Sequence, residues 1–275
     1  MRKQIVILFL LFSIFSITTA FAQRVDTIEV FSAKMNRGIK NLVVLPEGYD
    51  EASDVKYPVL YLLHGHGGTY DTWLKVTKKT LAEEANRWQM IFVCPDGQNS
   101  WYWDSPVDPK MQFETYVSSE LTSYIDDNYR TVASPKGRAV TGFSMGGHGG
   151  LWLGFNHPDV FGACGSLSGG VDIRPFPNNW NMKDWLGIYK ENKEIWESHT
   201  VINILDEIEP NTLAIIIDCG VQDFFYQVNE ELHKELLYRN IGHEYVTRPG
   251  GHTHGYWNDA IDYQMLFFSK FFNKK

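Results

Sequence analysis

The chain has 275 residues, of which 44% are hydrophobic and 15% aromatic, and this composition excludes an intrinsically disordered protein. Its 33 acidic residues outnumber its 25 basic residues, for a formal net charge of −8. Because no run of Lys or Arg is present, we do not expect nucleic acid or an anionic membrane surface as a partner.

The N-terminus has the three parts of a secretory signal peptide. Two basic residues come first, the apolar run "IVILFLLFSIFSI" follows, and a cleavage signal of the Ala-x-Ala type ends at Ala22. An uncleaved membrane anchor is the alternative, but the run is short for a span of about 20 residues. The pattern predicts a signal peptide over 1–22, no membrane span after cleavage, and a secreted or periplasmic protein.

Beyond the signal peptide, apolar runs rich in strand-forming residues alternate with helical periodicity. We expect strands at 41–46, 58–65, 90–97, 138–144, 163–169, 213–220 and 243–251. Apolar stripes predict helices at 113–129, 225–239 and 256–272. Most strand runs are continuously apolar, which is typical of strands covered on both faces. The alternation predicts an α/β fold with a mostly parallel sheet between helices, and strands before residue 58 that pair antiparallel at its edge.

Residues 170–212 break this alternation with prolines, asparagines and tryptophans, and one short helix is expected around 190–199. We interpret the segment as an insertion near the active site, so that 23–275 form one domain. The three cysteines, Cys94, Cys164 and Cys219, lie in or at the end of apolar strand-like runs. This placement indicates buried free thiols rather than disulfides.

The motif "GFSMGG" (142–147) carries the sharpest chemical signal in the chain. A strand-like run precedes it, and a helix-compatible run follows it as far as Pro158. A G-x-S-x-G motif between a strand and a helix is typical of a nucleophile elbow, which projects a serine at the carboxyl end of a sheet. The motif therefore predicts Ser144 as a nucleophile, with a plain structural turn as the alternative.

A serine nucleophile needs a base and an acid that orients the base. In doubly wound hydrolases the acid and the histidine follow the serine in chain order, each after a later strand. Asp223 lies in a loop beyond the run "LAIIIDCG", whereas Asp218 lies inside that run. His252 follows two glycines after the last strand, and His254 is its rival. We favour Asp223 as the acid and His252 as the base.

The tetrahedral intermediate of acyl transfer needs two preorganised hydrogen-bond donors for its oxyanion. Met145, directly after the nucleophile, is expected to supply one backbone N–H. The stretch "HGHGG" (64–68) ends a central strand, where the second donor belongs, and we assign it to the His66 N–H.

A metal site is the alternative interpretation of the histidine-rich segments. Its ligands would come from His64, His66, Asp223, His252 and His254. That hypothesis leaves the elbow and the order of acid and histidine unexplained, so we expect no metal and no cofactor. His148 would lie in the first turn after the nucleophile, where positive charge is disfavoured, and we expect it to be neutral.

Six segments of the chain together resemble one esterase family of the α/β-hydrolase superfamily. They are "YLLHGHGG" (61–68), "NSWYWDSP" (99–106), "FETYVSSELTSYIDDNY" (113–129), "GFSMGGHGGL" (142–151), "DCGVQDFF" (218–225) and "PGGHTHGYW" (249–257). The family includes S-formylglutathione hydrolases, secreted feruloyl and acetyl-xylan esterases, and mycolyltransferases. The resemblance implies the α/β-hydrolase fold, the triad Ser144, Asp223 and His252, and oxyanion donors from His66 and Met145.

Substrate-binding residues are harder to predict from this chain. Trp101, Tyr102 and Asp104 follow a strand of the sheet, so their loop is expected to border the site. Arg174 and Trp180, in the segment 170–212, would form the other wall. The alternatives are packing of the aromatic residues under a loop and a structural ion pair for Arg174.

These residues together predict a secreted serine carboxylesterase that acts through an acyl-enzyme. The substrate we expect is an acetyl- or feruloyl-type ester on plant polysaccharides or oligosaccharides. An acyltransferase, a general esterase similar to S-formylglutathione hydrolase, and a noncatalytic glycan-binding protein remain as alternatives.

Overall fold

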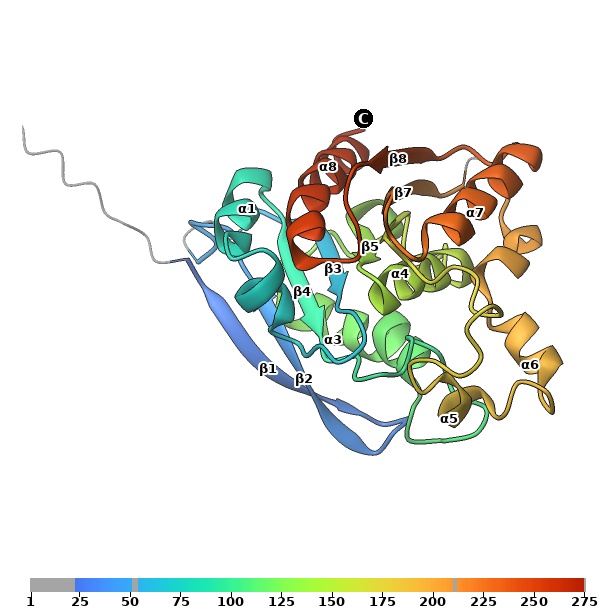
Figure 1. Cartoon of the computed structure of the whole chain (residues 1–275). Coiled ribbons are helices and arrows are strands. Elements are labelled where there is room, and N and C mark those ends of the chain that lie inside the picture. Colours follow the sequence, from blue (N-terminus) through green and yellow to red (C-terminus); the bar gives the residue numbers. More distant parts are fainter. Residues whose placement is uncertain (1–22, 51–53, 210–211, 275) are drawn as a thin grey trace, which may run out of the picture.

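The computed structural model describes residues 23–50, 54–209 and 212–274, so the predicted signal peptide, 1–22, lies outside the described residues. The described residues form one sheet in the order β1-β2-β4-β3-β5-β6-β7-β8 (Figure 1). Its strands are β1 (Val25–Ser32), β2 (Arg37–Val44), β3 (Val59–Leu63), β4 (Ile91–Pro95), β5 (Arg138–Gly142), β6 (Ala163–Leu167), β7 (Ala214–Gly220) and β8 (Glu244–Arg248).

The sheet is parallel except at one edge. Strand β2 pairs antiparallel with both β1 and β4, and every pairing from β4 to β8 is parallel. The predicted α/β fold with antiparallel first strands is therefore confirmed. Because parallel strands point the same way, their carboxyl ends share one edge of the sheet, where the loops that carry function in such folds gather.

Helices lie between the parallel strands, and one more follows the last strand. They are α1 (Leu81–Trp88), α2 (Phe113–Thr115), α3 (Thr122–Asn128), α4 (Met145–Asn156), α5 (Met182–Leu186), α6 (Lys193–Ser198), α7 (Tyr226–Tyr238) and α8 (His254–Phe272). A π-helical segment, η2 (Tyr116–Leu121), joins α2 to α3, so the predicted helix at 113–129 is confirmed as one continuous element. The predictions at 225–239 and 256–272 correspond to α7 and α8.

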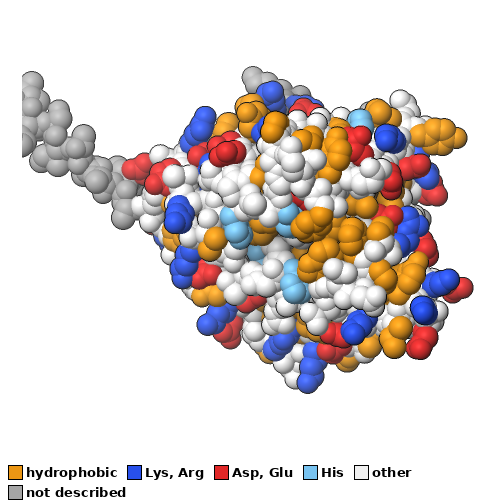
Figure 2. Space-filling model, in the orientation of Figure 1, with side chains coloured by type: hydrophobic (Ala, Val, Ile, Leu, Met, Phe, Trp, Pro, Cys, Tyr) orange, Lys and Arg blue, Asp and Glu red, His pale blue; other side chains and the backbone are white. Residues whose placement is uncertain are grey.

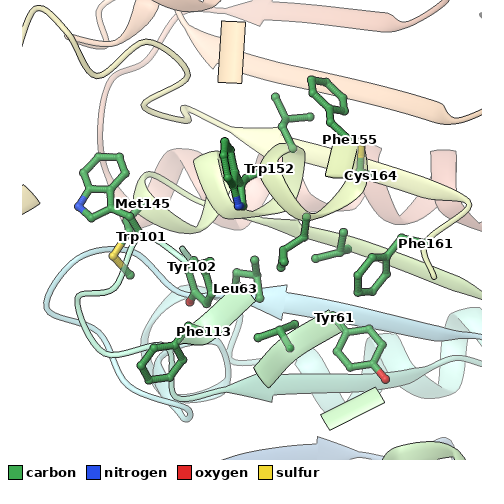
Figure 3. Close-up of a cluster of buried hydrophobic side chains, with 14 of the residues drawn as sticks. Tyr61, Leu63, Trp101, Tyr102, Phe113, Met145, Trp152, Phe155, Phe161 and Cys164 are labelled. Atoms are coloured by element: carbon green, nitrogen blue, oxygen red, sulfur yellow. The ribbon is translucent and has the colours of Figure 1, made fainter. Parts of the chain in front are cut away.

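Each face of the sheet carries its own hydrophobic core. Side chains of β3 alternate between the two cores: Tyr61 and Leu63 face one core, and Leu60 and Leu62 face the other. The first core is closed by α2, η2, α3, α4 and α7, and the second by α1 and α8. Figure 3 shows the first core, where aromatic side chains from several elements pack around β3 and α4. Burial of each large side chain stabilises the fold by about 1.5–3 kcal/mol.

The segment 170–212 contains the short helices α5 and α6. Helix α6 confirms the helix expected around 190–199, whereas α5 was not predicted. That the segment is an insertion within a single domain stays an interpretation. None of the helices in the described part of the chain combines the length and apolar character that a membrane span requires.

The cysteines are buried and free, as predicted. Cys94 lies in β4, Cys164 in β6 and Cys219 in β7, so the three thiols belong to three strands of the sheet. Burial raises the pKa of each thiol well above its ordinary value.

Candidate active site

Ser144 occupies a strained turn between β5 and α4. Its backbone has φ 58° and ψ −119°, in a region that L-residues seldom adopt. The Ser144 N–H donates to the Leu167 carbonyl at 2.9 Å, which ties the turn to the end of β6. A residue held in such a conformation by its surroundings is typical of a functional site.

Two glycines of the motif are required because the turn lies against the β3 backbone. A Cβ atom on Gly142 would lie 2.4 Å from the Leu63 carbonyl oxygen, and one on Gly146 would lie 2.3 Å from the same oxygen. Any larger residue at either position would push the turn away from the sheet. The motif therefore fixes where the Ser144 hydroxyl emerges.

The structure brings the three predicted triad residues together. The Ser144 hydroxyl lies 2.8 Å from His252 Nε2, and His252 Nδ1 lies 2.8 and 3.0 Å from the two carboxylate oxygens of Asp223. The carboxylate accepts the Nδ1–H, which leaves Nε2 free to accept a proton from the serine. This is the arrangement that activates a serine as a nucleophile.

Asp223 is fixed before any substrate binds. Its side chain is fully buried, and its Oδ1 accepts a hydrogen bond from the Phe225 N–H at 2.8 Å. Asp218, the rival acid, is also buried but accepts hydrogen bonds from Arg248 and from the Tyr256 hydroxyl. It links β7 to β8 through Arg248, and no hydrogen bond joins it to His252 within the described part of the chain.

His254, the rival base, lies at the start of α8. Its Nδ1 lies 2.9 Å from the Thr77 hydroxyl, so it is engaged away from the nucleophile. Burial lowers the pKa of His254, and the neighbouring His252 lowers it further. Thr253 caps the helix because its hydroxyl accepts a hydrogen bond from the Tyr256 N–H at 3.2 Å.

The two predicted oxyanion donors lie beside the nucleophile. Met145 is the first residue of α4, where a backbone N–H has no partner within the helix. His66 lines the same pocket as Ser144. Neither N–H makes a hydrogen bond with another group among the described residues, so both can donate to a bound oxygen. Burial lowers the pKa of the His66 imidazole, which keeps that side chain neutral near pH 7.

A pocket of about 460 Å³ opens above Ser144, a volume within the range of small-molecule sites. It is lined by Gly65, His66, Gly67, Gly68, Thr72, Val76, Phe143, Ser144, Trp180, Phe224, His252, His254 and Trp257. Sequence reasoning missed Phe224 and Trp257 as pocket residues. Phe224 directly follows the predicted acid, and this adjacency was the available signal.

One side of the pocket is aromatic. Phe224 packs against the His252 ring with centroids 4.2 Å apart, and Trp180 stacks on Phe224 at 5.8 Å. Phe224 is 52% exposed and lines the pocket. Figure 2 shows hydrophobic surface next to histidine side chains on this face of the molecule. Such a wall suits a flat or apolar substrate group.

Four of the five predicted substrate-binding residues lie away from this pocket, and only Trp180 lines it. Trp101 and Tyr102 are buried in the core, where the Tyr102 hydroxyl donates to the His64 carbonyl. Asp104 accepts hydrogen bonds from the Thr115 N–H and hydroxyl.

Arg174 was expected to contact the substrate, but it forms a structural ion pair instead. Its guanidinium binds Asp172 at 2.7 Å and Glu197 at 2.9 Å, and the surface hollow that it borders does not contain Ser144. The structural alternatives considered from the sequence therefore describe Trp101, Tyr102 and Arg174 better than substrate contact does.

The histidines of "HGHGG" have separate roles. The His64 Nδ1–H donates to the Gly65 carbonyl at 2.8 Å, and His64 Nε2 accepts the Gly97 N–H at 2.9 Å. Both ring nitrogens are thus used within the protein. Within residues 23–50, 54–209 and 212–274, no three His, Cys, Asp or Glu side chains are grouped as metal ligands would be.

Comparison with known proteins agrees with this geometry. The chain is 36% identical over 135 residues to esterase Rv1288 of Mycobacterium tuberculosis, a match that covers 48% of this chain and 29% of that protein. It therefore spans under a third of that relative's length. It is 24% identical over 264 residues to an acetyl esterase of Caldicellulosiruptor saccharolyticus, across 88% of this chain and 97% of the relative.

Among solved structures, a ferulic acid esterase superposes with a TM-score of 0.78 at 27% identity, over 91% of this chain and 99% of that one. The family model described as "Putative esterase" matches residues 32–268, which include every strand from β2 to β8 and all three triad residues. The chain belongs to this esterase family of α/β hydrolases.

Proposed function

We propose that the protein is an exported serine carboxylesterase that removes acetyl- or feruloyl-type groups from plant polysaccharides or oligosaccharides. The observation that carries the proposal is the hydrogen-bonded series Ser144–His252–Asp223 at a pocket with two backbone N–H donors that have no partner among the described residues. The N-terminal signal pattern supports export. The similarity to an acetyl esterase and to a ferulic acid esterase supports the two acyl classes.

In the first half of the reaction, His252 Nε2 accepts the proton of the Ser144 hydroxyl as its oxygen attacks the ester carbonyl carbon. The carbonyl oxygen gains negative charge and accepts hydrogen bonds from the His66 and Met145 N–H groups. In serine hydrolases, loss of one such donor costs about 10²–10³ in kcat. The protonated His252 then donates its proton to the departing alcohol, and the acyl group stays on Ser144.

In the second half, His252 removes a proton from a water molecule that attacks the acyl-enzyme. Ser144 recovers its proton from His252 as the free acid leaves. Asp223 accepts the Nδ1–H throughout, so it keeps the imidazole in the required tautomer and stabilises its charged form. The buried position of the carboxylate strengthens this interaction.

The pocket walls suit an ester that joins an acyl group to a sugar. Trp180 and Phe224 form the aromatic side, on which a sugar ring or a phenolic acyl group can stack. Thr72 and His254 supply polar groups along the pocket lining, where hydroxyl groups of a glycan can form hydrogen bonds.

The test is release of acetate and ferulate from acetylated and feruloylated oligosaccharides, with wild type compared with Ser144→Ala. We expect the substitution to lower kcat by about 10⁶-fold. Ser198→Ala, which alters a serine of α6 outside the pocket, is the matched control and should leave release unchanged. Wild-type turnover in Ser144→Ala would refute the mechanism.

The same assay separates the alternatives. Acyl transfer to an added sugar in preference to water would identify an acyltransferase. Hydrolysis of S-formylglutathione without release from either oligosaccharide would identify a general esterase. Glycan binding without any ester hydrolysis would identify a noncatalytic protein.

A further inference from the structure

We propose that Asn99 is a positioning residue for ester hydrolysis, because its side-chain oxygen holds the turn 65–68 with the His66 N–H directed at the oxyanion. The inference rests on the proposed function, since an oxyanion forms only if Ser144 attacks a carbonyl. Asn99 does not line the pocket itself and acts through the backbone of Gly67.

The contact that carries the inference is made next to the predicted donor. The Gly67 N–H donates to Asn99 Oδ1 at 2.7 Å, which is at the short end of the range for such a hydrogen bond. Gly67 has φ +77°, and the Gly68 N–H closes the turn on the Gly65 carbonyl at 3.0 Å. The orientation of the Gly67 peptide is therefore coupled directly to that of His66.

Little else holds the tip of this turn. A Cβ atom placed on Gly67 would have no heavy atom within 4 Å, and the residue is exposed. A glycine in open space has many accessible backbone conformations. The Asn99 oxygen restricts the turn to one of them, at the residue that follows His66.

The loop that carries Asn99 also holds the other end of the turn. The Gly97 N–H donates to His64 Nε2 at 2.9 Å, and Ser100 closes its own loop because its hydroxyl donates to the Gly97 carbonyl at 2.7 Å. One loop therefore holds the turn at two places. Gly97 binds His64, before His66, and Asn99 binds Gly67, after it. The start and the tip of the turn are fixed relative to each other.

This arrangement matters because an oxyanion donor lowers the barrier only if it is oriented before the charge develops. Without the Asn99 oxygen, the Gly67 N–H would form a hydrogen bond with water instead. The His66 N–H would then point away from the oxyanion for part of the time. The substrate ground state depends little on this donor, so the loss should appear in kcat rather than in KM.

The test compares Asn99→Leu, which removes the acceptor at nearly constant size, with Asn99→Asp, which keeps an oxygen in its place. With 4-nitrophenyl acetate, we expect Asn99→Leu to lower kcat by about 5- to 15-fold, the effect of one lost hydrogen bond, with KM unchanged. Affinity for a boronic acid that mimics the tetrahedral intermediate should fall in parallel. Asn99→Asp should lose less of both than Asn99→Leu.

Gln98→Ala is the control within the same loop, because its side chain contacts Arg37 and not the turn 65–68. It should keep wild-type kcat and analogue affinity. The inference is overturned if Asn99→Leu keeps both, if its loss lies in KM or melting temperature alone, or if Asn99→Asp loses as much. The proposed function fails separately, if wild type itself hydrolyses no ester.

Discussion

Acid should destabilise this protein through one histidine that takes no part in the reaction. His148 lies in α4, fully buried, where its ring packs edge-on against the stacked rings of Trp101 and Trp103. Its Nδ1–H donates to the Gly170 carbonyl at 3.1 Å. Burial lowers the pKa of His148 to about 3 from an ordinary value of 6.5. The folded protein therefore keeps this imidazole neutral at a pH where the unfolded chain protonates it.

Proton linkage gives the sign and the size of this change in the free energy of unfolding. The stabilisation is fully present above pH 6.5 and is lost as the pH falls towards the folded pKa, because only the unfolded chain gains the proton in that range. Each pH unit in this window removes about 1.4 kcal/mol from the free energy of unfolding. Between pH 7.5 and pH 4.5, His148 alone should remove about 3 kcal/mol.

Urea denaturation at the two pH values measures this loss in wild type and in His148→Asn. Asparagine does not titrate and keeps an N–H for the Gly170 carbonyl, while the other titrating groups contribute equally to both proteins. We expect wild type to lose about 3 kcal/mol more than the variant. An equal loss in the two proteins would refute the assignment of a depressed pKa to His148.

Two further substitutions test the elbow and the pocket boundary. Gly146→Ala would place a Cβ atom 2.3 Å from the Leu63 carbonyl oxygen, so we expect destabilisation by about 2–4 kcal/mol and loss of ester hydrolysis. Gly255→Ala, whose nearest neighbour would be 3.9 Å away, is its control in thermal melts, and equal melting temperatures would contradict the close approach. Arg174→Ala should leave kcat and KM unchanged and lower the free energy of unfolding by about 1 kcal/mol or less. A large rise in KM would show instead that Arg174 binds the substrate.

The parts of the site that follow local rules could be predicted from the sequence. A serine between glycines at a strand-to-helix junction can only be accommodated as a tight turn, and the structure has that turn at Ser144. Asp223 and His252 follow later strands of a parallel sheet, so the topology brings them to the same edge. The main strands and their order depend on short-range patterns, and the parallel topology that they imply brings the three residues together.

The direction of the aromatic loop could not be predicted. Trp101 and Tyr102 have φ of 58° and 61°, so two consecutive bulky residues adopt a left-handed backbone that such residues rarely adopt. This conformation turns both side chains into the core, where an ordinary loop would have left them at the surface. No pattern in "NSWYWDSP" indicates it, because the surrounding packing imposes the conformation.

Contacts between residues distant in sequence account for the remaining errors. Arg174 is held partly by Glu197, which lies in α6, and a sequence pattern does not indicate which acidic residue such a side chain will meet. Phe224 reaches the pocket because Asp223 beside it is fixed by the Phe225 N–H. Tertiary structure sets both outcomes.

The three buried thiols can be used to follow unfolding of the sheet. Cys94, Cys164 and Cys219 sit in three different strands, and each has a raised pKa, so a reagent that alkylates thiolates reaches them only when the sheet opens. Labelling rates at each cysteine, read by mass spectrometry, would therefore show whether β4, β6 and β7 open together or one at a time. Among the described residues, all three cysteines are buried, so an oxidant finds no exposed thiol in the folded protein.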